Sequence, residues 1–340
     1  MRSNVRYRVG LVGSGSWATA LAKILTDNHF RINWWMRKEA DIRSMHLRKY
    51  NPSYLSSVRF DLKNIILSSN ATEVILNSDW VIFCIPSAFI REVLEPLPRQ
   101  IFGDKSVISA IKGIIPGENI LLNEYLLRHF QFPLTSYFTI MGPCHAEEVA
   151  AQKLTYITFS GKDYPTARSI AKRFITRYLK TVVNDDIWGA QYGAVLKNIY
   201  AIGAGIAHSL GYGDNFLSVY IANCAGEMTA FNDAVNRSEN HIYENRNPFA
   251  GAYLGDLLVT CYSPYSRNRS FGTMIGKGYT VRAAQMEMNM VAEGYYAARC
   301  IHEISQAAGL QVPMAENIYS ILYEQLSPFD AFGRIEKMLI

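Results

Sequence analysis

The chain has 340 residues, of which 49% are hydrophobic and 19% are charged, and its formal net charge at pH 7 is +5. This composition is typical of a globular protein and excludes a disordered one, and the length is sufficient for two domains. The positive charge is mild and spread along the chain. It gives little support to a nucleic-acid surface, although it is compatible with a small anionic ligand.

Cysteine and histidine spacing argues against a metal site. The five cysteines lie far apart without a C-x-x-C pair, and the seven histidines show no H-x-x-H spacing. We therefore expect no metal, and we expect free thiols in a reducing cytoplasm. A first strand from about residue 7 leaves no room for a signal peptide, and no stretch matches an uncharged membrane span of about 18 residues. We predict a cytoplasmic protein without an integral membrane segment.

Short β-rich runs alternate with amphipathic stretches in the first half of the chain. The predicted strands lie at residues 7–13, 31–36, 79–86, 106–113, 136–142 and 154–161. Between several of them are helical patterns, such as 88–97 and 117–130, with apolar residues three and four positions apart. Strands that alternate with helices predict an α/β fold with a mostly parallel sheet, covered on both faces.

After about residue 186 the pattern changes to long Ala- and Met-rich segments with helical periodicity, at 187–211, 215–236 and 281–309, and no comparable strand follows. We therefore predict an α/β domain of the Rossmann type at residues 1–186 and an all-helical domain at residues 187–340.

The segment after the first predicted strand reads Gly13-Ser14-Gly15-Ser16-Trp17-Ala18 and fits the pattern G-x-G-x-x-G/A. The first glycine permits a tight turn, and the second lets the backbone approach a pyrophosphate at the positive end of the following helix. The alanine in the third position still allows close packing of helix and strand. Because the motif directly follows a strand, it predicts a dinucleotide site.

A second cofactor signal lies about 20 residues further on, where NAD-selective folds usually carry an acidic residue. This chain has Arg37 followed by Lys38 there. A guanidinium at this place can stack on adenine and bind a 2′-phosphate. The pattern favours NADP(H), with NAD(H) also possible; a solvated pair of charges at the start of a helix is the alternative.

Two lysines are candidates for chemistry. Lys112 ends a predicted parallel strand, at the edge where ligands bind in open α/β sheets, although a surface position is the commoner fate of a lysine. Lys197 and Asn198 lie in an otherwise apolar helical stretch, "GAVLKNIYAIGAGIA". A buried ammonium needs a partner or a depressed pKa, and such a lysine near a carbonyl is a candidate general acid and base. An exposed helical stripe is the alternative.

Two further segments are compatible with anion binding. "IMGPCHAEEVA" at residues 140–150 ends a strand with Gly-Pro and begins a helix, so its N–H groups could receive an anion or a nicotinamide amide; it is also an ordinary strand–turn–helix junction. Further on, Asp256 precedes the loop Ser266-Arg267-Asn268-Arg269, whose side chains are the donors that a phosphate monoester needs. Alone, that loop would indicate only surface charge.

Together these segments resemble the bacterial-type NAD(P)-dependent glycerol-3-phosphate dehydrogenases over almost the full length of the chain. The shared motifs, in the family's order and spacing, are "GSGSWATALA", "AIKGI", "GPCHAEEVA", "LKNIYAIGAGI", "GDLLVTCYSPYSRNRSFG" and "VAEGY". The resemblance implies a fold similar to 6-phosphogluconate dehydrogenase and the reversible reduction of dihydroxyacetone phosphate to sn-glycerol 3-phosphate, which supplies phospholipid synthesis. A homodimer is a possible assembly.

The resemblance also implies residue roles. Lys197 would be the proton donor and acceptor, with Lys112 as the second catalytic residue. Substrate contacts are implied for Lys112, Gly142, Cys144, Lys197, Asp256, Ser266, Arg267 and Asn268. The glycine motif places Gly13 and Gly15 at the cofactor. The resemblance adds cofactor contacts for Ser16, Trp17, Arg37, Lys112, Ala146, Arg267, Val291 and Glu293.

Three positions depart from the family pattern. Cys144 stands where serine or threonine is usual, so a hydroxyl contact becomes a weaker thiol contact. His208 replaces a more usual aspartate, and Asn223 replaces a more usual arginine. If the family's arginine at this position contributes to phosphate binding or to a subunit contact, Asn223 does not provide the same contribution. None of the three removes a residue expected to perform chemistry.

Two other functions compete with this interpretation. A hydroxyacid or ketopantoate-type reductase would share the glycine motif and the helical second domain, but the Ser-Arg-Asn-Arg loop argues against it. A non-catalytic sensor of NAD(P)H is the other alternative. The presence of both Lys112 and Lys197 argues against a sensor, which needs neither.

Overall fold

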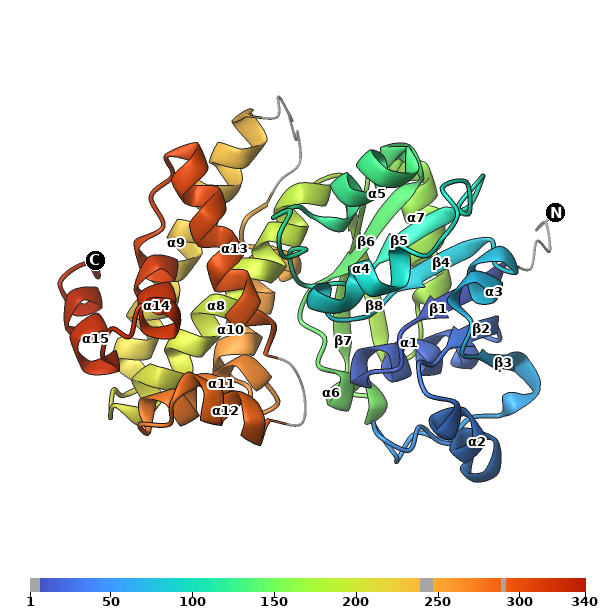
Figure 1. The fold of residues 1–340 in the computed structure, drawn as a ribbon, viewed down its shortest axis with the longest axis horizontal. Helices are drawn as coiled ribbons and strands as arrows, with labels where there is room; N and C mark the ends of the chain where they lie inside the picture. Colours follow the sequence, from blue (N-terminus) through green and yellow to red (C-terminus); the bar gives the residue numbers. More distant parts are fainter. Residues whose placement is uncertain (1–6, 239–246, 289–291) are drawn as a thin grey trace. The chain divides into compact units, whose positions relative to one another are not determined.

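An eight-stranded sheet forms the centre of the first compact unit in the computed structural model, which describes residues 7–238, 247–288 and 292–340 (Figure 1). The strands are β1 (Arg8–Val12), β2 (Arg31–Trp35), β3 (Ile65–Ser68), β4 (Trp80–Phe83), β5 (Ser106–Ser109), β6 (Tyr137–Met141), β7 (Thr155–Gly161) and β8 (Leu179–Asn184).

The strand order is β3-β2-β1-β4-β5-β6-β7-β8, and every neighbouring pair is parallel except β6 and β7. Val12 at the end of β1 pairs with Trp35 of β2 on one side and with Phe83 of β4 on the other. The strand order therefore reverses at β1, and right-handed crossovers in opposite directions place helices on opposite faces of the sheet. Ligands of such sheets bind at the carboxyl ends of the strands where this reversal occurs.

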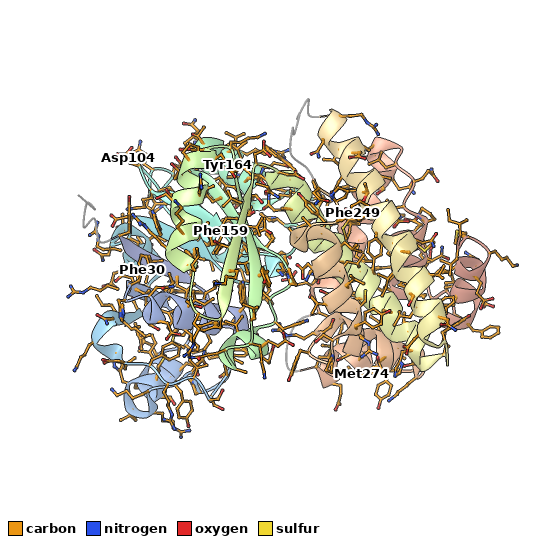
Figure 2. All side chains as sticks on the ribbon, turned by 180° about the vertical axis from the view of Figure 1, so that it is seen from behind. Phe30, Asp104, Phe159, Tyr164, Phe249 and Met274 are labelled. Atoms are coloured by element: carbon orange, nitrogen blue, oxygen red, sulfur yellow. The ribbon has the colours of Figure 1, made fainter. Side chains whose placement is uncertain are left out.

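The predicted fold class is confirmed, with two strands that the sequence analysis did not identify. These are β3 and β8, which form the two edges of the sheet. Only Ile65 of β3 and Leu179 of β8 are buried, so neither strand shows the continuous apolar run of a central strand. The interior of the sheet unit is rich in aromatic residues, and Phe159 of β7 is completely buried there (Figure 2).

Helices cover this sheet. They are α1 (Ser16–Asp27), α2 (Glu39–Arg48), α3 (Ala71–Leu76), α4 (Ile90–Leu94), α5 (Leu122–Phe130), α6 (Ala146–Ala150) and α7 (Tyr164–Phe174). Helix α1 packs on β1 and β2 and buries most of its small and aliphatic side chains, as its alternation of alanine with leucine and isoleucine requires.

The second unit is helical and also includes two short stretches from the first half of the chain, residues 86–88 and 112–121. Its helices are α8 (Ile187–Ser209), α9 (Asp214–Ser238), α10 (Asp256–Tyr262), α11 (Arg267–Gly276), α12 (Val281–Glu287), α13 (Glu293–Ala308), α14 (Pro313–Tyr323) and α15 (Pro328–Glu336). The segment 281–309, expected as one helical stretch, contains two separate helices, α12 and α13. Within the described residues, no helix combines the length and the apolar character needed to cross a membrane.

Helices α8 and α11 approach each other backbone to backbone. A Cβ atom at Gly205 would lie 2.0 Å from the carbonyl oxygen of Arg269, and one at Gly272 would lie 1.9 Å from that of Ile202. Any side chain at these two glycines would therefore push α11 away from α8. This close contact fixes the start of α11, at Arg267, relative to the helix that carries Lys197.

A buried carboxylate holds the start of α14. Glu227 of α9 accepts hydrogen bonds from the backbone N–H groups of Met314 and Ala315 and from the hydroxyl of Tyr200. Burial raises the pKa of Glu227 to about 7, against the lowering effect of these three hydrogen bonds. The carboxyl group therefore binds a proton more tightly in the folded chain than in the unfolded chain, where its pKa is about 4.5.

We predict that this carboxyl group destabilises the folded chain as the pH rises from about 4.5 to 7. In that range the folded state keeps a proton that the unfolded state releases, so the free energy of unfolding falls with rising pH. The loss, relative to a Glu227→Gln variant, should be about 3 kcal/mol. Denaturant unfolding of both proteins between pH 4 and 8 measures this difference, and parallel stability curves would contradict the prediction.

Candidate active site

The loop between β1 and α1 has the geometry that the glycine motif predicts. Gly13 has φ of +133°, and a Cβ atom there would lie 2.1 Å from the carbonyl oxygen of Cys84, so only glycine fits. Apart from its neighbours in the chain, no described residue has an atom within 4 Å of the position that a Cβ of Gly15 would take. Among the described side chains none caps the start of α1, and the first turn of that helix contains no acidic residue. The N–H groups of that turn and its positive dipole therefore suit an anion.

Two side chains from later in the chain fix this loop. The indole of Trp34 donates a hydrogen bond of 2.6 Å to the carbonyl oxygen of Gly13. The side-chain amide of Asn51, which is completely buried, donates to the carbonyl oxygen of Ser14 at 2.9 Å and to Oγ1 of Thr19 at 2.8 Å. The carbonyl oxygens of Gly13 and Ser14 therefore have donors within the protein, and these hydrogen bonds hold the loop in place.

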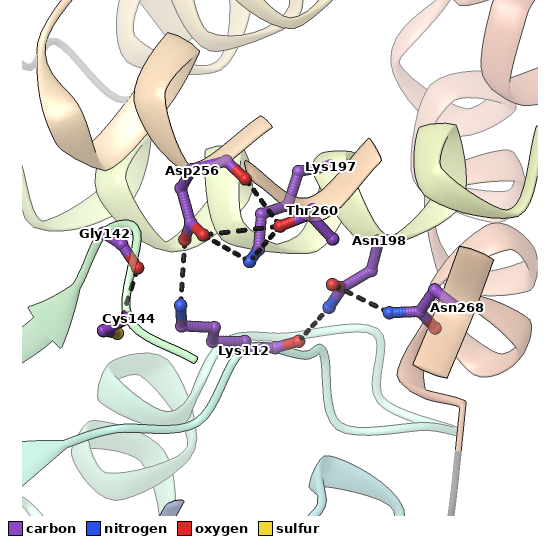
Figure 3. Close-up of polar contacts among 8 residues, drawn as sticks. All are labelled: Lys112, Gly142, Cys144, Lys197, Asn198, Asp256, Thr260 and Asn268. Atoms are coloured by element: carbon purple, nitrogen blue, oxygen red, sulfur yellow. Dashed lines mark hydrogen bonds and ion pairs between the residues drawn. The ribbon is translucent and has the colours of Figure 1, made fainter. Parts of the chain in front are cut away.

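The remaining cofactor and substrate candidates of the sheet unit lie after β2, in α1 and around the start of α6. Arg37 follows β2 and is exposed. Nε1 of Trp17 is buried and has no hydrogen-bond partner among the described residues. Ala146 begins α6, while Gly142 and Cys144 lie in the preceding turn, where the Cys144 thiol donates to the carbonyl oxygen of Gly142 at 3.0 Å (Figure 3).

These features fit a bound dinucleotide. The open space at Gly15 admits a pyrophosphate, the uncapped turn of α1 offers N–H donors, and the buried Nε1 of Trp17 is a donor without a partner in the part of the chain that the structure describes.

In the helical unit, one carboxylate holds two lysines (Figure 3). Lys197 of α8 donates to Oδ1 of Asp256 at 2.6 Å and to Oγ1 of Thr260 at 2.9 Å. Lys112 donates to the other oxygen, Oδ2 of Asp256, at 2.9 Å. The side chains of Lys197 and Asp256 are only 6% and 2% exposed, so the ammonium that the apolar helix buries has the partner it needs.

The net charge of this lysine–aspartate cluster (Lys112, Lys197 and Asp256) depends on whether Asp256 is ionised. Burial alone would raise the pKa of Asp256, but the two ammonium groups outweigh it and hold the pKa below its ordinary value. Asp256 is therefore ionised at neutral pH. With both lysines charged, the cluster carries a net charge of about +1, which suits an anionic ligand or a developing negative charge.

A chain of amide hydrogen bonds connects this cluster to α11 and α13. Nδ2 of Asn198 donates to the backbone carbonyl of Lys112 at 3.0 Å, and Nδ2 of Asn268 donates to Oδ1 of Asn198 at 2.9 Å. Oδ1 of Asn268 in turn accepts from the N–H of Gly294 at 2.9 Å. Four segments distant in the sequence are thereby held together beside Lys197.

The other predicted residues of the helical unit also have defined contacts. Ser266 is the N-cap of α11 and accepts from the N–H of Arg269, while Arg267 begins that helix and is half-buried. Glu293 begins α13 and accepts hydrogen bonds from the N–H and Oγ of Ser87. Burial raises the pKa of Glu293. Val291, also expected at the cofactor, lies outside the described residues.

The sequence analysis missed three residues with structural importance here. Thr260 lies four positions after Asp256, so helical spacing could have placed both on one face of α10. Asn51 precedes a proline in a polar stretch and gives no sequence signal of its contact with the glycine loop. Ser87 has no such signal either, because its partner Glu293 is more than 200 residues away.

The structure also locates the two remaining departures from the family pattern. His208 is exposed in the last turn of α8. The side chain of Asn223 bonds to the backbone of Val219 and to the N–H and carbonyl of Ile340 at the chain end. In the described parts of the chain, no group of His, Cys, Asp and Glu side chains is arranged to hold a metal ion.

We predict that Asn51→Ala weakens dinucleotide binding about tenfold, because the carbonyl of Ser14 loses its donor and the loop loses its fixed conformation. Fluorescence titration with NADPH and NADH measures the affinity. Asp163→Ala is the control, since Asp163 caps α7 after the antiparallel strand β7, at the opposite edge of the sheet, and should cost stability without changing affinity. Unchanged affinity in Asn51→Ala would contradict a role in positioning the loop.

Comparison with known proteins identifies the family. A family profile for the NAD-dependent glycerol-3-phosphate dehydrogenase N-terminus matches residues 8–167, and one for the C-terminus matches residues 186–333. A glycerol-3-phosphate dehydrogenase (NAD(P)+) of Halalkalibacterium halodurans is 31% identical over 335 residues, covering 97% of this chain and 94% of that protein. A protein of the same name from Bacillus thuringiensis is 31% identical over 330 residues, with 96% and 95% covered.

The structural comparison agrees. The crystal structure of glycerol-3-phosphate dehydrogenase from Coxiella burnetii matches with a TM-score of 0.88 at 25% identity, covering 97% of this chain and 98% of that one. On the two profiles, the relatives and the matching fold, the chain belongs to the NAD-dependent glycerol-3-phosphate dehydrogenase family.

Proposed function

We propose that the protein is an NAD(P)-dependent sn-glycerol-3-phosphate dehydrogenase that reversibly reduces dihydroxyacetone phosphate and supplies glycerophospholipid synthesis. The observation that carries this proposal is the buried cluster of Lys112, Lys197 and Asp256, in a chain whose curated relatives carry that enzyme name. A buried cationic cluster suits a reaction in which a ketone oxygen gains negative charge.

Lys197 is the proposed general acid in the direction of reduction. A bound dinucleotide would supply the hydride for the ketone carbon, and Nζ of Lys197 would donate the proton that the ketone oxygen takes up. In the reverse direction the same nitrogen accepts the hydroxyl proton. Asp256 supports this role because its lowered pKa keeps it ionised beside the ammonium, and Thr260 fixes the position of Nζ. Lys112 adds positive charge beside the same oxygen.

The phosphate of the substrate is proposed to bind Ser266, Arg267 and Asn268. Nδ2 of Asn268 carries a second N–H beside the one donated to Asn198, and the guanidinium of Arg267 can bind a phosphate with two parallel hydrogen bonds. Binding energy from this phosphate would position the reacting carbon. Gly142 and Cys144 are proposed to border the substrate.

The dinucleotide is proposed to contact the glycine loop and its surroundings, namely Gly13, Gly15, Ser16, Trp17, Arg37, Lys112, Ala146, Arg267, Val291 and Glu293. Exposed Arg37 favours NADP(H) over NAD(H), because a guanidinium binds a 2′-phosphate that an acidic residue would repel. We further propose a cytoplasmic location, consistent with five free cysteines, a homodimer, and domain limits of 1–186 and 187–340.

Substrate selectivity tests the function. Oxidation of NADPH or NADH should be rapid with dihydroxyacetone phosphate and slow with unphosphorylated dihydroxyacetone or with ketopantoate, followed by the absorbance of the reduced nicotinamide. Faster turnover of ketopantoate would instead indicate a ketopantoate-type reductase. Cofactor binding without turnover of any ketone would indicate a sensor.

We predict that Lys197→Ala lowers kcat about 1,000-fold, because the alkoxide loses its proton donor, while dinucleotide affinity stays nearly unchanged. Steady-state kinetics and a fluorescence titration measure the two quantities. Lys277→Ala, which removes an exposed lysine from the end of α11, is the matched control and should keep full activity. A Lys197→Ala enzyme that keeps most of its kcat would refute the assignment.

We predict that Arg37→Ala lowers kcat/KM for NADPH about tenfold and leaves that for NADH nearly unchanged, because only NADPH loses a charged partner. The ratio of the two values, measured at saturating ketone, reports the effect. Arg43→Ala removes an exposed arginine from α2 and should leave the ratio as it is. An equal loss for both cofactors would show that Arg37 does not select the 2′-phosphate.

A further inference from the structure

A hollow of about 780 Å³ opens at the edge of the sheet where β1 and β2 begin. We call it the amino-edge hollow. Its lining residues come from the start of β1, the turn between α1 and β2, the approach to β3, and α7. They are Tyr7, Arg8, Asn28, His29, Phe30, Arg31, Asn64, Lys172 and Arg173.

This hollow is separate from the dinucleotide loop. Arg8 and Arg31 are the first residues of β1 and β2, whereas Gly13 and Arg37 follow the carboxyl ends of the same two strands. At a rise of about 3.3 Å per residue, β1 alone separates the two edges by roughly 13 Å. A ligand of the amino-edge hollow would therefore not contact the pyrophosphate site.

The lining is cationic. Among the described residues it includes three arginines, one lysine and one histidine, with no aspartate or glutamate. Arg8 is paired with Asp79 at 2.9 Å, so its charge is compensated. Arg31 and Lys172 are exposed, and the structure shows no carboxylate partner for either within the described residues. The hollow therefore offers uncompensated positive charge to an anion.

One wall of the hollow is aromatic and carries polar donors without partners. The ring of Tyr7 stacks on that of Trp80 with centroids 4.4 Å apart, and the guanidinium of Arg173 lies 5.0 Å from the centre of the Tyr7 ring. The ring of Phe30 lies with its centroid 6.0 Å from that of Trp80. Nε of Arg173 and Nδ2 of Asn28 are buried without a hydrogen-bond partner in the described chain, although buried donors are normally satisfied.

We propose that the amino-edge hollow is a second binding site, for a small phosphorylated ligand with a flat or apolar body. The cations of Arg31, Lys172 and Arg173 would bind the phosphate, with Arg173 Nε and Asn28 Nδ2 as hydrogen-bond donors. Tyr7 and Phe30 would contact the apolar body. This proposal does not depend on the reaction assigned above, because it uses no residue of that site.

Calorimetric titration with two probes, inorganic phosphate and 1-naphthyl phosphate, tests the site. The titrations use the full chain without added nucleotide or ketone, because both carry phosphates that the amino-edge hollow itself would bind; the variants described next separate the hollow from the other proposed sites. We expect both probes to bind, and 1-naphthyl phosphate to bind about tenfold more tightly because its ring meets the aromatic wall. Absence of binding, or equal affinities for the two probes, would overturn the proposal.

Variants locate the binding. Arg31→Ala combined with Lys172→Ala should weaken both probes about tenfold, whereas Tyr7→Ala should remove only the advantage of 1-naphthyl phosphate. The matched control is Arg99→Ala combined with Lys180→Ala, which removes one exposed arginine and one exposed lysine of the same unit outside the hollow. An equal loss in the control pair would show general charge attraction and would overturn the assignment.

Vesicle cosedimentation distinguishes a lipid headgroup from a soluble phosphorylated metabolite as the ligand of the hollow. Vesicles of phosphatidic acid present the same phosphate monoester on a membrane lipid. Cosedimentation that disappears in the Arg31/Lys172 double variant would assign the site to a lipid headgroup. Binding of the soluble probes without cosedimentation would assign it to a free phosphorylated metabolite. Either result supports the site itself.

Discussion

The carboxylate of Asp256 holds two ammonium groups at once, and the proposed chemistry depends on this interaction. Burial of a single lysine in the apolar helix α8 would cost several kcal/mol, and the ion pair with Asp256 offsets that cost only while both partners are charged. The second lysine, Lys112, acts with Lys197 to hold the pKa of Asp256 below its ordinary value, so the carboxylate stays ionised between two ammonium groups. The cluster therefore presents positive charge in a buried environment, where its electrostatic attraction for an anion is strongest.

Packing within the helical unit positions Asp256 and the polar residues beside it. Asp256 and Thr260 lie one turn apart on α10, so both can reach the same ammonium. Glycines at the α8–α11 contact let α11 approach until Asn268 meets Asn198. The apolar stretch around Lys197 is therefore a packing surface, and its two polar residues are the points at which other segments attach.

The sequence predicts those features whose physical cause is local. The tight turn at Gly13, the alternation of strands and helices, and the need of a buried Lys197 for a partner all follow from residue types and spacing. The edge strands β3 and β8 lack a local signal, because half-exposed strands have few apolar residues. The contact of Asn51 with the glycine loop is a consequence of tertiary packing, which no pattern in one sequence encodes.

In both units, an asparagine from a distant segment donates a hydrogen bond to a loop carbonyl. A loop carbonyl that is not paired within a helix or sheet costs free energy when it is buried without a donor. Asn51 donates to the carbonyl of Ser14 in the sheet unit, and Asn198 donates to that of Lys112 in the helical unit. In each case an asparagine from a distant segment supplies the missing donor with a neutral group.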